Sequence, residues 1–135
     1  MIGAGAFGGW TALYLLRQGA EVTLIDEWGA GNGVSSSGGE NRLVRAAYGR
    51  QRIYSELMIR AFQLWEENER RWGKTLLTRT GALRWGGTEL PSQKSAIPLL
   101  AELGVTLEPL TPYEAGPRYP QINFDGMVSV YFEHG

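Results

Sequence analysis

The chain has 135 residues, 43% of them hydrophobic, which is enough for a globular domain with a packed core. Its formal net charge of -1, with both signs interspersed, gives no broad basic surface for nucleic acid. It has no cysteine, which excludes a disulfide framework and a thiolate metal site. Because it shows neither a run of about 18 apolar residues nor a signal-peptide pattern, we predict a cytoplasmic protein with no nucleic-acid or membrane partner.

A helix followed by a strand is predicted at the start of the chain. Apolar residues recur at helical spacing over residues 7–18, directly after a glycine-rich stretch. Gly19 then stands where a helix C-cap belongs, and residues 21–26 (EVTLID) have the β-branched, apolar character of a strand. Residues 27–41 are rich in Gly and Ser without periodicity, so we expect an ordered or ligand-bound loop there.

The later elements alternate between helix and strand. Apolar residues at steps of three and four over residues 54–72 predict the longest helix. We expect its polar face to be solvated, and that face carries Glu56, Arg60, Gln63, Glu67 and Arg71. Weaker patterns predict a strand at 78–85 broken by Gly81, a helix at 92–103 interrupted at Pro98 and ending at Gly104, a strand at 105–110, a short helix at 111–116 and a last strand at 127–132.

The glycine-rich opening, MIGAGAFGG, contains the pattern GxGxxG. This pattern alone is weak evidence, because 19 of the 135 residues are glycine. Its continuation is more specific, since it extends without a gap to GxGxxGxxxAxxLxxxGxxVxxxD. The residues that match are Gly3, Gly5, Gly8, Ala12, Leu15, Gly19, Val22 and Asp26. The whole pattern is typical of the βαβ unit that binds dinucleotides.

Each position of this pattern has a physical role in such a unit. Gly3 permits a tight turn out of the first strand, Gly5 lets the backbone approach a pyrophosphate, and Gly8 lets helix and strand pack closely. The helix N-terminus offers N–H donors and the positive end of its dipole to the phosphates. Asp26, eighteen residues after Gly8, can accept hydrogen bonds from a ribose diol and repels a 2'-phosphate, which disfavours NADP. The alternative is a glycine-rich helix start that binds nothing.

The first strand of a βαβ unit is expected before the glycines, but only Met1 and Ile2 stand there. Such a strand has about five or six residues and lies near the centre of the sheet. At the other end, residues 133–135 follow a strand-like run with no closing helix. We therefore expect a fragment of a longer protein, unstable or cofactor-free and inactive on its own.

Two further stretches are distinctive: SSSGGENRLVRAAYG at residues 35–49 and YPQINFDGMVSVYFEHG at residues 119–135. Together with the glycine pattern they resemble the FAD-dependent amine oxidases of the D-amino-acid oxidase superfamily, most closely the branch of sarcosine and N-methyl-amino-acid oxidases. The resemblance runs over essentially the whole chain and corresponds to the N-terminal third of a complete enzyme. Ser37 and Gly38 stand where the sarcosine oxidases carry a histidine pair, so the chain departs from the branch there.

The resemblance implies an α/β fold class. Residues 1–80 would form the N-terminal part of a Rossmann-type FAD-binding domain, incomplete because its first strand is largely missing. Residues 81–135 would begin the substrate-binding domain, which is truncated as well.

The resemblance also implies FAD as the cofactor and assigns residues to its site. The implied FAD-binding residues are Gly3, Gly5, Ala6, Phe7, Gly8, Asp26, Ser35, Ser36, Ser37 and Arg42. Arg42 would lie beside the flavin ring and Arg45 would hold a substrate carboxylate, a task suited to the guanidinium fork. Without the resemblance, the sequence favours the alternative that Arg42 and Arg45 are surface residues in salt bridges. We expect Tyr48 to pack rather than react, and His134, the only histidine, to have no catalytic role.

The implied reaction oxidises the C–N bond of an amino acid or N-methyl amino acid. A hydride equivalent passes from the carbon beside the amine nitrogen to flavin N5, the imine hydrolyses, and oxygen is reduced to peroxide. We expect a small-molecule amine substrate and a monomeric complete protein. An NAD-dependent dehydrogenase is an alternative that leaves residues 35–49 unexplained, and a non-catalytic fragment or subunit completed by a partner chain is another.

Overall fold

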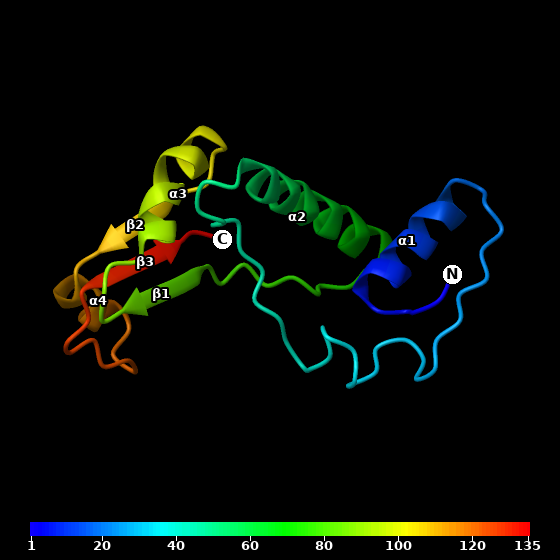
Figure 1. Ribbon diagram of the computed structural model, residues 1–135, viewed down its shortest axis with the longest axis horizontal. Helices are drawn as coiled ribbons and strands as arrows, with labels where there is room; N and C mark the ends of the chain where they lie inside the picture. The colour runs from blue at the N-terminus through cyan, green and yellow to red at the C-terminus, as the bar shows by residue number, and fades with distance from the viewer. The chain divides into compact units, whose positions relative to one another are not determined.

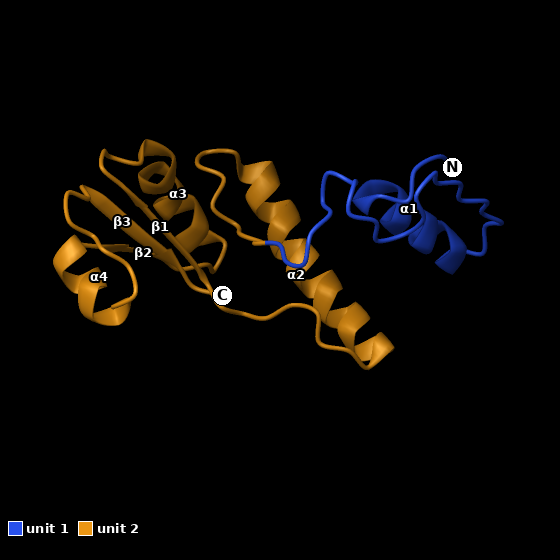
Figure 2. Cartoon of the chain, turned by 90° about the horizontal axis from the view of Figure 1, so that it is seen from below, with its two compact units in different colours: residues 1–42 blue, residues 43–135 orange.

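A computed structural model describes all 135 residues, which separate into two compact units, residues 1–42 and residues 43–135 (Figure 2). The elements in chain order (Figure 1) are α1 (Ala6–Arg17), α2 (Arg52–Trp72), β1 (Ala82–Gly86), α3 (Pro91–Glu102), β2 (Leu107–Leu110), α4 (Pro112–Arg118) and β3 (Ser129–Glu133). None of the helices combines the length and the apolar character that crossing a membrane requires.

The first unit contains α1 and one parallel backbone pairing. α1 follows the glycines directly, as predicted. Ile2 and Ile25 form a parallel bridge, in which the Ile25 N–H donates to the Met1 carbonyl at 3.0 Å and the Gly3 N–H donates to the Ile25 carbonyl at 2.8 Å. The strand predicted at residues 21–26 is therefore reduced to a single bridge, because no longer segment pairs with it. Residues 27–41 contain no helix or strand, which confirms the predicted loop.

α2 is the longest helix and confirms the periodicity from which it was predicted. It ends at Gly73, whose φ of 61° lies in the left-handed region that glycine tolerates best. All five residues of the predicted polar face are exposed. The apolar face is only partly covered, since Tyr54 and Leu57 remain 50% and 56% exposed.

The second unit is built around a three-stranded antiparallel sheet with the strand order β1-β3-β2. Successive side chains of a strand point to opposite faces. On one face, Leu107 and Tyr131 pack against α3 with Ala46 and Ala47, while on the other Val130 packs against α4. The central strand β3 thus contributes to two separate hydrophobic clusters (Figure 1).

Two predicted details of the second unit differ from the structure. The strand predicted at 78–85 is shorter and begins at Ala82, directly after the break predicted at Gly81, where φ is 70° and a Cβ would lie 2.4 Å from the Phe132 ring. The predicted interruption at Pro98 is wrong, since α3 continues through it. Pro98 cannot donate to the Lys94 carbonyl, but both residues are exposed, so water can satisfy that carbonyl.

The capped helix predicted near residue 111 is confirmed. The Glu114 N–H donates to Thr111 Oγ1 at 3.2 Å, and the Glu114 carboxylate accepts the Thr111 N–H at 2.8 Å, which makes a capping box at the start of α4.

From α2 onward helices and strands alternate along the chain, which is consistent with the predicted α/β class. The parallel bridge in the first unit is the pairing that a βαβ start calls for, whereas the three named strands are antiparallel. The Rossmann detail and the domain boundary at residue 80 stay predictions.

Candidate functional site

The glycine turn before α1 requires glycine at two of its three positions. Gly3 has a φ of 93°, which side chains other than glycine rarely adopt. A Cβ on Gly8 would lie 1.8 Å from the Gly3 carbonyl oxygen, so the first turn of α1 packs directly on the Gly3 turn. These contacts confirm the close helix packing that the sequence pattern predicted.

Gly5 differs from its neighbours, because the protein's own packing does not demand a glycine there. A Cβ built on Gly5 meets no atom within 4 Å. Gly5 is the N-cap of α1, no side chain caps the helix, and its first turn holds no acidic residue. Ala6 and Phe7 begin the helix and are exposed. The N–H groups of this turn can therefore receive an anion with close backbone approach, and these residues fit the diphosphate of a dinucleotide.

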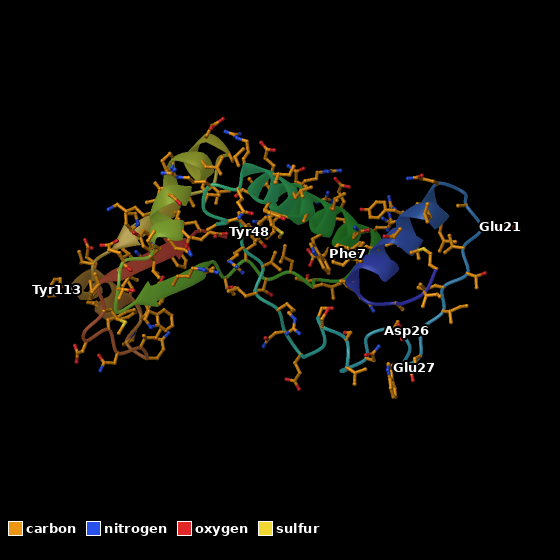
Figure 3. The ribbon with its side chains drawn as sticks, viewed as in Figure 1. Phe7, Glu21, Asp26, Glu27, Tyr48 and Tyr113 are labelled. Atoms are coloured by element: carbon orange, nitrogen blue, oxygen red, sulfur yellow. The ribbon has the colours of Figure 1, made fainter.

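Asp26 lies beside the glycine turn (Figure 3). Its Oδ2 accepts the Ala4 N–H at 2.7 Å and its Oδ1 accepts the Trp28 N–H at 2.9 Å. These hydrogen bonds, the one from Ala4 first, hold the pKa of Asp26 below its ordinary value. The carboxylate is thus ionised near neutral pH, and each of its oxygens retains a lone pair that can accept a ribose hydroxyl.

The serines of the predicted cofactor loop lie in a turn organised by Asn32. Asn32 Oδ1 accepts the N–H groups of Val34 and Ser35 at 3.1 and 2.9 Å. Ser35 is half-buried and its hydroxyl donates to the Asn32 carbonyl at 3.2 Å, whereas Ser36 and Ser37 are exposed. The two exposed hydroxyls are free of intrachain hydrogen bonds in this turn and can serve a ligand.

The two predicted arginines lie in different units of the chain. Arg42 is exposed in the first unit, where its guanidinium donates to the Asn41 carbonyl at 3.0 Å and to the Gly38 carbonyl. Arg45 belongs to the second unit. Neither arginine forms a salt bridge within these residues.

A buried carboxylate fixes the backbone that carries Arg45. Glu133, at the end of β3, is 5% exposed, and its two oxygens accept the N–H groups of Ala46 and Ala47, the latter at 3.0 Å. On the other side, the buried Ser55 hydroxyl donates to the Ala46 carbonyl at 2.7 Å. Both polar groups of Ala46 are therefore held by side chains, which sets the position of the preceding Arg45.

The Arg45 side chain lies among aromatic and charged groups. Its guanidinium carbon is 5.2 Å from the centre of the Tyr48 ring, which is within cation–π range. Its Nε is buried and has no hydrogen-bond partner. Arg84 of β1 has a buried Nε without a partner as well, and it interacts electrostatically with Arg45. We call Arg45 and Arg84 the arginine pair.

Sequence reasoning missed Arg84 and Glu133. The sequence did contain a signal for both residues, because each is a charged residue within an otherwise largely apolar strand: ALRWG in β1 and SVYFE in β3. A charge at such a position must be buried or paired. His134 lies at the surface, with Nε2 3.0 Å from Glu108 Oε2.

Comparisons of the sequence with known proteins find relatives over nearly the whole chain. The profile of the family described as "FAD dependent oxidoreductase" (DAO) matches residues 1–135. Monomeric sarcosine oxidase from Arthrobacter sp. (strain TE1826) is 29% identical over 98% of this chain and 34% of its own length. Peroxisomal sarcosine oxidase from Mus musculus is 32% identical over 92% of this chain and 32% of its own length. N-methyl-L-tryptophan oxidase from Citrobacter koseri is 28% identical over 90% of this chain and 33% of its own length.

The chain spans about a third of the length of these curated relatives. The cofactor of the matched family is FAD, which agrees with the predicted cofactor and not with the NAD-dependent alternative. The chain belongs to the DAO family of FAD-dependent oxidoreductases.

Proposed function

We propose that this chain is the N-terminal part of an amine oxidase that acts on an amino acid or an N-methyl amino acid. The observation that carries the proposal is Arg45, whose neighbouring backbone is held by Glu133 and whose guanidinium has no carboxylate partner among these 135 residues. The names of the similar proteins, which include sarcosine and N-methyl-L-tryptophan oxidases, support the same substrate class.

The residues around the start of α1 would hold FAD. Gly3 and Gly8 shape the turn, Gly5 admits the diphosphate, and Asp26 accepts the ribose hydroxyls. Exposed Ser36, Ser37 and Arg42 would add hydrogen-bond donors along the cofactor. When bound, the flavin supplies the acceptor for a hydride equivalent from the carbon beside the amine nitrogen, and oxygen then reoxidises it.

Arg45 would bind the substrate carboxylate and thereby orient the amine. A guanidinium presents parallel N–H donors that match the two oxygens of a carboxylate. Its backbone is held by Glu133 and Ser55, and its plane lies near the Tyr48 ring, so little freedom is lost when the substrate binds. Tyr48 serves here as a support for Arg45, which agrees with the packing role predicted for it.

The test is Arg45→Lys in the complete FAD-loaded enzyme, assayed with sarcosine. Lysine keeps the charge but loses the bidentate fork, and a charge-assisted hydrogen bond contributes about 1.5 to 3 kcal/mol. We expect KM to rise at least about tenfold. The matched control is Arg60→Lys on the exposed face of α2, which should leave KM unchanged. Unchanged kinetics in Arg45→Lys would remove Arg45 from the substrate site, and a purified enzyme that retains NADP instead of flavin would refute the proposal as a whole.

A further inference from the structure

Arg84 is placed on the same face of the sheet as the groups that position Arg45. It lies in the edge strand β1 and pairs in register with Tyr131 of β3, while Ala82 pairs with Glu133. Residues two apart on a strand share a face, so Arg84, Tyr131 and Glu133 lie on one side of the sheet. This is the side on which Ala46 and Ala47 pack.

Within this chain, Glu133 offsets only part of the charge of the arginine pair. Neither guanidinium forms a salt bridge, and the Nε of each is buried without a hydrogen-bond partner. Both oxygens of Glu133 are already used by backbone N–H groups. Burial first, and the charge of Arg45 second, lower the pKa of Arg84 from its ordinary value, although Glu133 and Tyr48 act in the opposite direction. Two like charges held together in a partly buried place are unfavourable unless an anion joins them.

The charge of the cluster indicates which anion fits. Arg45 and Arg84 are cations and Glu133 is an anion, so the three side chains together carry a single positive charge. One monocarboxylate balances this charge, whereas a dicarboxylate would leave an excess negative charge. Guanidinium N–H donors from two directions can saturate the lone pairs of one carboxylate.

We infer that Arg84 is a second guanidinium of the substrate-carboxylate site and shares one carboxylate with Arg45. The inference rests on the proposed function of Arg45. It gives the site a preference for amino-acid substrates over simple amines, because a substrate without the carboxylate leaves two half-buried cations without an anion between them. Arg84 acts in recognition and takes no part in proton or hydride transfer.

Binding of a non-oxidisable carboxylate tests the inference directly. The complete FAD-loaded enzyme is titrated with acetate and, separately, malonate, and binding is followed by the flavin absorbance change and by calorimetry. The variants are Arg84→Met, Arg84→Lys, Arg45→Met and the control Arg60→Met. We expect Arg84→Met and Arg45→Met each to weaken acetate binding at least about tenfold, Arg84→Lys to restore part of it, and Arg60→Met to change nothing.

Thermal stability separates recognition from a structural role. Arg84→Met removes a repulsive charge, so its Tm should equal or exceed that of the parent enzyme, and KM for sarcosine should rise more than kcat falls. If Arg84→Met lowers the Tm and leaves the acetate Kd unchanged, Arg84 has a structural role and the inference is wrong. If Arg45→Met still weakens acetate binding in that case, the proposed function of Arg45 is unaffected. If neither Arg84→Met nor Arg45→Met weakens acetate binding, the assignments of both arginines to the carboxylate site are wrong. If only malonate depends on Arg84, the pair binds two carboxylates and the single-carboxylate site is wrong.

Discussion

Glu133→Gln should release the backbone that carries Arg45. In the structure, the buried Glu133 carboxylate accepts two N–H groups, from Ala46 and Ala47. Glutamine has the same shape but only one acceptor oxygen, and its amide nitrogen is itself a donor. One of the two backbone N–H groups therefore faces another donor and stays unpaired in a buried place.

The cost follows from the two hydrogen bonds. A hydrogen bond to a charged group contributes about 1.5 to 3 kcal/mol, and an unpaired buried N–H costs about 1 to 3 kcal/mol. Because the second bond survives in weakened form, we expect a loss of roughly 2 to 5 kcal/mol in the local stability of this segment. Since about 1.4 kcal/mol corresponds to a factor of ten, local opening should become at least roughly thirtyfold more frequent.

Hydrogen exchange measures this opening where it occurs. In the complete enzyme, the peptide that contains Ala46 and Ala47 should exchange faster in Glu133→Gln by at least that factor. The control is Glu67→Gln on α2, whose carboxylate forms a surface ion pair with Arg60 and should not affect this peptide. Equal exchange of the peptide in Glu133→Gln and the parent enzyme would show that the carboxylate does not hold the segment, and the positioning argument for Arg45 would fail.

Two further predictions concern the first unit. Gly8→Ala should prevent the glycine turn from forming, since the added Cβ would lie 1.8 Å from the Gly3 oxygen, whereas Gly5→Ala should fold and lose only FAD affinity. Circular dichroism measures folding and the flavin-to-protein ratio measures FAD binding. Equal results for the two variants would contradict the packing described for Gly8. The pKa of Asp26 is lowered from 3.8 in the folded chain, so its stabilising effect is present above that value and is lost as pH falls through the lowered pKa. The Tm of the FAD-free enzyme should therefore drop further on acidification for the parent than for Asp26→Asn, and identical acid profiles would exclude this contribution.

Local sequence patterns predicted the elements whose cause is local. α1 begins at the glycines, α2 has its exposed charged face, and Thr111 and Glu114 cap α4 through contacts three residues apart. The helix interruption predicted at Pro98 was wrong, because a helix can continue through a proline when another donor hydrogen-bonds to the carbonyl left without its N–H partner. At this position solvent can do so, which the sequence pattern alone does not reveal.

The candidate substrate site was less accessible to sequence reasoning because its parts come from distant segments. Arg45 was assigned through a family resemblance, while Arg84 and Glu133 acquire meaning only when β1 and β3 pair. The pairing register brings their side chains to one face, and register depends on tertiary packing. The glycines at residues 3 and 8 were predictable in detail, since backbone sterics restrict those positions to one residue type.

The hydrogen bond between Ala46 and Glu133 joins residues separated by 87 positions. During synthesis on the ribosome, a chain that grows by about 5 to 20 residues per second needs roughly 4 to 17 seconds to cover that interval. Throughout this time only water can accept hydrogen bonds from the N–H groups of Ala46 and Ala47, because Glu133 has not yet been synthesised. The backbone beside Arg45 is thus held in place only after β3 has been made and has paired between β1 and β2.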